Sequence, residues 1–70
     1  MELLILASHV GRDDRPLLSL AKMPQIKEVH ECGGYIVAKA RVESLADIRR
    51  VADVVRRCPG VLRVEILVRR

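Results

Sequence analysis

The sequence contains no Trp, Phe, Asn or Thr, and Tyr35 is its only aromatic residue. One aromatic side chain cannot form the row of stacking platforms that single-strand nucleic-acid binders use. No apolar run approaches the roughly 20 residues needed to cross a bilayer, and the first residues lack the basic region of a signal peptide. We therefore expect no direct nucleic-acid partner, no membrane partner and a cytoplasmic location.

Cysteine is scarce too, because Cys32 and Cys58 are the only two. They are too few for a disulfide framework, and they lack the spacing of a metal motif. The sequence shows no recognisable Ser/His/Asp arrangement, no phosphate-cradling glycine loop and no close acid pair with a reason to split its pKa values. These absences predict a protein that is not an enzyme and has no cofactor.

Side-chain amides are nearly absent, with Gln25 alone, and arginine far exceeds lysine. A heat-adapted source would avoid thermolabile amides, and a GC-rich genome would favour arginine in the same way, so both explanations stay open. The net charge is +4, but acidic residues interrupt the arginines along the chain. This spacing predicts a solvated basic surface.

With 70 residues, of which half are apolar and 31% charged, the chain has the balance of one small globular domain spanning 1–70. Such a short chain buries only roughly 60% of its unfolded surface, so its own core is marginal. The apolar pattern predicts strands over four segments, namely 3–10, 26–32, 35–42 and 61–68.

Two helices are predicted between these strands. A short one begins after Asp14 and is stopped by Pro24, whereas a longer one begins at a Ser44–Asp47 capping box and ends at Pro59-Gly60. The apolar stripe of the longer helix is expected to comprise Leu45, Ile48, Val51, Ala52, Val55 and Cys58.

The resulting order is strand, helix, strand, strand, helix, strand, which is the ferredoxin-like α+β pattern. Right-handed crossovers place the first strand between the third and the fourth. We therefore expect an antiparallel sheet of order 4-1-3-2 with both helices on one face.

The first strand is central in this arrangement, yet residues 3–7 leave neither of its faces polar. Near-continuous apolar strands are usually buried on both sides, and an exposed apolar patch usually marks an interface. We predict that two copies pack sheet against sheet, the alternative being a monomer with a partly apolar exposed sheet. The predicted dimer face comprises Leu3, Ile5, Val37, Lys39, Arg41, Arg63, Glu65 and Leu67.

His9, His30 and Cys32 are expected near one end of the sheet, and His and Cys side chains are metal ligands. However, the strands carrying His9 and His30 are separated by the third strand, which places them roughly 10 Å apart. The favoured interpretation is ordinary packing or surface placement, with metal binding as the alternative.

Several short motifs together resemble a known module. They are Leu20-Ala21-Lys22-Met23-Pro24, Val29-His30-Glu31, Gly33-x-Tyr35 and Pro59-Gly60-Val61-Leu62-Arg63-Val64-Glu65. In this order they resemble the C-terminal effector-binding and oligomerisation domain of the Lrp/AsnC transcription regulators, the RAM domain. The resemblance spans nearly the whole chain, and its most telling part is the Gly-x-Tyr hairpin followed by a helix that ends in Pro-Gly-Val-x-Arg.

The resemblance implies sheet-to-sheet dimers, often in octameric rings, and an amino-acid effector bound between dimers near the hairpin turn. It assigns effector binding to Gly33, Gly34 and Tyr35. The family commonly has an Asp after this tyrosine, where this chain has Ile36, and it often has threonines in the last strand. The side chains best suited to a free amino acid are therefore missing.

Because Met1 directly precedes the first strand, the chain resembles a stand-alone form of the module without the family's DNA-binding helix-turn-helix. We expect it to dimerise, and to bind an amino acid or co-assemble with a full-length regulator. The alternative is a chaperone-like binder of a signal-peptide helix on the open sheet face. The Cys-x-x-Cys loop of metallochaperones and the catalytic Asn of acylphosphatases, which share this fold, are absent.

Overall fold

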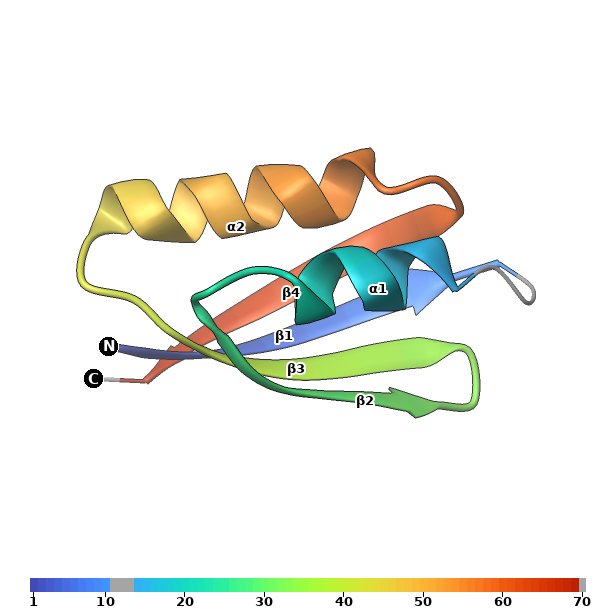
Figure 1. Ribbon diagram of the computed structural model, residues 1–70, viewed down its shortest axis with the longest axis horizontal. Helices are drawn as coiled ribbons and strands as arrows, with labels where there is room; N and C mark the ends of the chain where they lie inside the picture. Colours follow the sequence, from blue (N-terminus) through green and yellow to red (C-terminus); the bar gives the residue numbers. More distant parts are fainter. Residues whose placement is uncertain (11–13, 70) are drawn as a thin grey trace.

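A four-stranded antiparallel sheet forms one layer and two helices form the other, as Figure 1 shows. The computed structural model describes residues 1–10 and 14–69. The elements are β1 (Glu2–His9), α1 (Arg15–Ala21), β2 (Ile26–Cys32), β3 (Tyr35–Arg41), α2 (Leu45–Arg57) and β4 (Val61–Arg69). The sheet order is β2-β3-β1-β4, so the predicted ferredoxin-like α+β fold and strand order are confirmed.

The β2–β3 hairpin turns at Gly33 and Gly34, which adopt φ values of +53° and +84°. Two successive residues with positive φ are the conformation that a two-residue hairpin turn requires, and glycine adopts it without a steric penalty. The glycine pair thus sets the register in which Cys32 lies opposite Tyr35.

Helix α2 begins with the expected capping arrangement. The Asp47 backbone N–H donates to Ser44 Oγ at 3.3 Å, and the Asp47 carboxylate accepts from the Glu43 backbone N–H at 3.2 Å. Two otherwise unpaired N–H groups are thereby satisfied, which favours a helix start at Leu45. Leu45 was predicted to join the buried stripe, but its side chain is 73% exposed, because the first residue of α2 projects beyond the packed turns.

The core lies between the helices and one face of the sheet. β1 contributes alternate residues to it, and the two strands beside β1 present their alternating apolar positions on the same side. The fully buried members with the largest side chains are Leu3, Ile5, Leu20, Ile36, Val42, Val51, Val55 and Pro16.

This packing corrects one part of the predicted dimer face. Leu3 and Ile5 are 2% and 0% exposed, and they pack beneath the helices. Because side chains alternate along a strand, their neighbours Leu4 and Leu6 occupy the opposite side of β1. An unbroken apolar run carries no alternation of its own, so the sequence of this strand did not reveal which of its residues face the helices.

Candidate functional site

The sheet side that bears no helix, here called the helix-free face, has no second layer packed on it among the described residues (Figure 1). Its four rows of side chains follow from the strand register. Taken from β2 to β4, the rows are Arg41–Glu2–Arg69, then Glu28–Lys39–Leu4–Leu67, then His30–Val37–Leu6–Glu65, and finally Cys32–Tyr35–Ser8–Arg63.

The centre of this face is apolar. Leu4, Leu6 and Val37 are half-buried, and Leu67 is 55% exposed. They come from the three strands β1, β3 and β4, and the register places them in two adjacent rows. These side chains form one contiguous aliphatic patch, of the kind that marks an interaction surface on a small protein.

Charged residues surround the patch and partly neutralise one another. Glu28 lies 3.5 Å from Lys39 Nζ, and Arg63 lies 3.0 Å from Glu65. Glu28 also lies 3.7 Å from His30 Nε2, a contact that is ionic only when the imidazole is protonated. These pairs are exposed, so each contributes little to the stability of the single chain. Their role on this face is to leave it close to electrically neutral.

Tyr35, Arg63 and Glu65 border a hollow of about 150 Å³ together with Leu6 and Ser8. Tyr35 was predicted as an effector-binding residue, whereas Arg63 and Glu65 were predicted only for the dimer face. The structure thus brings a phenol, a guanidinium and a carboxylate to one rim. Sequence reasoning missed this grouping because it depends on the register of three strands.

Gly33 and Gly34 lie at the tip of the hairpin, and both are exposed. A β-carbon built on either glycine meets no atom within 4 Å, so the turn borders open space. The backbone N–H and C=O groups of these two glycines are therefore the only groups that they offer to a ligand beside Tyr35.

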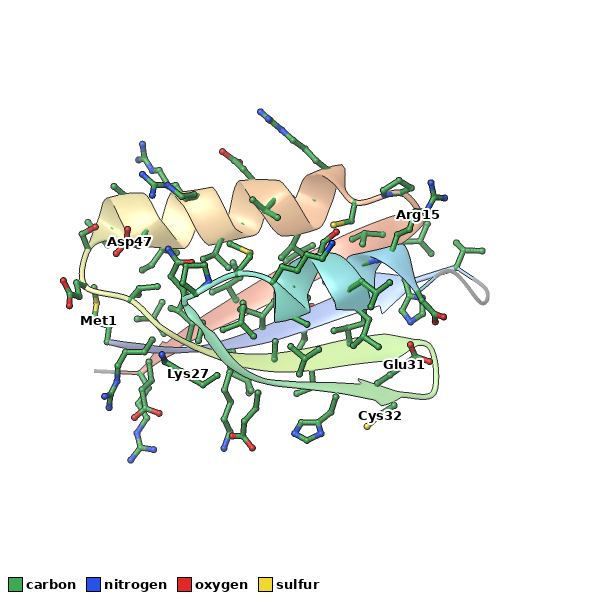
Figure 2. The ribbon with its side chains drawn as sticks, viewed as in Figure 1. Met1, Arg15, Lys27, Glu31, Cys32 and Asp47 are labelled. Atoms are coloured by element: carbon green, nitrogen blue, oxygen red, sulfur yellow. The ribbon has the colours of Figure 1, made fainter. Side chains whose placement is uncertain are left out.

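The sheet separates the three residues considered as metal ligands. His9 is buried on the helix side at the end of β1, whereas His30 and Cys32 lie on the helix-free face; Figure 2 shows Cys32 on the side away from the helices. Within residues 1–10 and 14–69, no three His, Cys, Asp or Glu residues are placed to hold a metal ion. Over the same ranges, no helix has the length and apolar character needed to cross a membrane.

The architecture places the chain among ferredoxin-like α+β proteins with an uncovered sheet face. TTHA0845 from Thermus thermophilus has a similar crystal structure, with a TM-score of 0.77 and 26% identity over 94% of this chain and 88% of that one. The crystal structure of FFRP-DM1 is similar too, with a TM-score of 0.73 and 19% identity over 96% of both chains. No protein-family model matches the sequence, and no curated protein matches it.

Proposed function

We propose that this chain is a RAM-like regulatory module that dimerises through its helix-free face. The aliphatic patch of Leu4, Leu6, Val37 and Leu67 carries the proposal, because it is an apolar area at the centre of a sheet face that no helix covers. Covering it with a second copy removes this patch from water on both chains, and each side chain contributes on the order of 1 kcal/mol. This gain matters in a 70-residue chain with a marginal core.

The charges on the face support a second copy as its occupant. Lys39, Arg41, Arg63 and Arg69 are balanced by three glutamates, Glu2, Glu28 and Glu65. Two nearly neutral faces meet without strong repulsion, and the mixed signs allow pairs to form across the interface. A signal-peptide helix, which begins with a basic segment, gains no such attraction from this face. The balance of charge therefore favours self-association over the chaperone-like alternative.

The likeness in fold to FFRP-DM1 supports the regulatory part of the proposal. We propose that an amino-acid effector binds at the rim formed by Tyr35, Arg63 and Glu65, beside Gly33 and Gly34. Arg63 and Glu65 pair with each other at 3.0 Å in the single chain, and the effector would replace this contact by placing its carboxylate against the guanidinium and its ammonium group against the carboxylate. The other proposed partner is a full-length Lrp/AsnC regulator that co-assembles with this chain. We propose no enzymatic activity for the chain.

Sedimentation equilibrium of two matched variants tests the assembly. Leu6→Glu places a charge in the middle of the patch, whereas Leu45→Glu places the same charge at a residue of α2 that is already 73% exposed. We expect Leu6→Glu to be monomeric and Leu45→Glu to remain dimeric at micromolar concentrations. Circular dichroism verifies that both variants are folded, and a dimeric folded Leu6→Glu protein contradicts the proposal.

Thermal unfolding with a panel of amino acids tests the effector, and sedimentation equilibrium of Arg63→Gln verifies that this variant still dimerises. A ligand that binds only the folded protein raises the unfolding temperature as its concentration increases. We expect a concentration-dependent rise for at least one amino acid and its loss in Arg63→Gln. If no amino acid raises the unfolding temperature, effector binding is refuted, but the proposed dimer is not affected.

A further inference from the structure

The groove between α2 and β4, on the opposite side of the sheet from the proposed dimer face, has the features of a second binding site. It has a volume of about 500 Å³ and is open to solvent. Val64, Ile66 and Val68 supply its apolar floor from β4, and Arg49, Asp53 and Arg56 supply its charged wall from α2. Figure 1 shows α2 running alongside β4 at the edge of the sheet.

The backbone beside this groove is available for pairing. Val42 donates to the Met1 carbonyl at 2.9 Å and His9 donates to the Gly34 carbonyl at 3.0 Å, so the odd-numbered residues of β1 bond to β3. The even-numbered residues therefore bond to β4, and their partners there are Arg63, Glu65, Leu67 and Arg69. The N–H and C=O groups of the intervening residues point away from β1.

Those outward-pointing groups belong to Val64, Ile66 and Val68, the same three residues that form the groove floor. In the described part of the chain, β1 is the only strand neighbour of β4. An added strand would thus form backbone hydrogen bonds and place alternate side chains in the groove, which is the geometry of peptide recognition by strand addition.

Two arginines and one aspartate form the wall of the groove, so the wall has a net charge of +1 and favours an acidic strand. None of the ion pairs among the described residues involves Arg49, Asp53 or Arg56. The two arginines are seven positions apart on α2, which corresponds to about 10.5 Å along the helix. Carboxylates at positions i and i+4 of an extended segment lie about 13 Å apart, and flexible arginine side chains accommodate the difference.

We propose that the α2–β4 groove binds an extended, acidic segment of another protein as a fifth strand beside β4. The segment carries an aliphatic residue between two carboxylates, so that the aliphatic side chain covers Ile66 and the carboxylates face Arg49 and Arg56. A second copy of β4 fits this edge poorly. It would bring valine and isoleucine to the arginines instead of carboxylates, and its own α2 would add two more arginines.

The proposal is independent of the dimer, because the groove and the helix-free face lie on opposite sides of the sheet. Its test uses the blocked peptide Thr-Glu-Thr-Val-Thr-Glu-Thr and the matched peptide Thr-Lys-Thr-Val-Thr-Lys-Thr. Each is titrated into the full chain labelled with nitrogen-15, and backbone amide shifts and amide exchange are followed. We expect saturable shifts and slowed exchange at Val64, Ile66 and Val68 with the glutamate peptide only.

Two double variants separate the groove from general basic attraction. Arg49→Gln/Arg56→Gln removes the groove arginines and should weaken binding at least about threefold. Arg50→Gln/Arg57→Gln removes two exposed arginines of the same helix that do not line the groove, and should change binding less than about twofold. The proposal is overturned by equal losses in both variants, equal binding of both peptides, no binding, or protection of the β4 amides that increases with protein concentration alone.

Discussion

His9 Nε2 lies 3.9 Å from Glu31 Oε2, although β3 runs between the strands that carry the two residues. The His9 side chain is 2% exposed, and within the described residues neither of its ring nitrogens has a hydrogen-bond partner. A buried polar group without a hydrogen bond costs about 1–3 kcal/mol of folding free energy. Burial of His9 therefore lowers the free energy of unfolding of this largely aliphatic core.

Replacing His9 with leucine should leave the free energy of unfolding unchanged or raise it by about 1 kcal/mol, since an apolar side chain has no polar atoms to desolvate. Urea denaturation at one fixed protein concentration measures the effect. His30→Leu is the matched control, because His30 is exposed on the other side of the sheet, and its substitution should shift stability by less than about 0.5 kcal/mol. A loss of more than about 1 kcal/mol in His9→Leu would show that His9 makes a stabilising interaction.

Ile5 and Leu4 are neighbours in β1 with opposite surroundings, and alanine substitutions should separate folding from assembly. Ile5→Ala removes a fully buried side chain and should cost about 2–5 kcal/mol. Leu4→Ala should cost less in the single chain but weaken the dimer. Urea denaturation at several protein concentrations shows the difference, because the midpoint of a dimer depends on concentration.

If Ile5→Ala does not fold, Ile5→Val can be compared with Leu4→Ala instead, because it should lower the free energy of unfolding by only about 1 kcal/mol. The interpretation of the two faces is wrong if Leu4→Ala retains the full concentration dependence of the wild-type chain.

Substitutions at Gly33 and Gly34 should change stability through backbone conformation alone, because a β-carbon at either position meets no other atom within 4 Å. Gly34→Ala should destabilise the protein by about 1 kcal/mol, since alanine is strained at φ +84°. Gly33→Asn should be nearly neutral, because asparagine tolerates φ near +53° and Asn-Gly is a favoured hairpin turn. Thermal unfolding measures both, and equal losses would contradict this account of the turn.

The fold could be predicted from local signals that agree with one another. The glycine pair marked the hairpin, the Ser44–Asp47 box marked the start of α2, and clear alternation in residues 35–42 assigned the faces of β3. Each signal depends on residues close in sequence, which is why it can be identified before the structure is known. The order of six elements then restricted the topology to one right-handed arrangement.

The faces of β1 and the edge groove needed three-dimensional information. Leu3 and Ile5 differ from Leu4 and Leu6 only in the side of the sheet that they occupy, and pairing with the alternating residues of β3 decides this. The α2–β4 groove combines side chains from two elements with a backbone edge. No local sequence pattern indicates such a combination.

We propose that a second copy of the chain covers the helix-free face. Light scattering coupled to size-exclusion chromatography on the unmodified chain tests it most directly, by measuring the mass in solution at micromolar concentrations. We expect a mass of at least twice the 7.9 kDa of the single chain. A uniform 7.9 kDa species over the whole concentration range would contradict it.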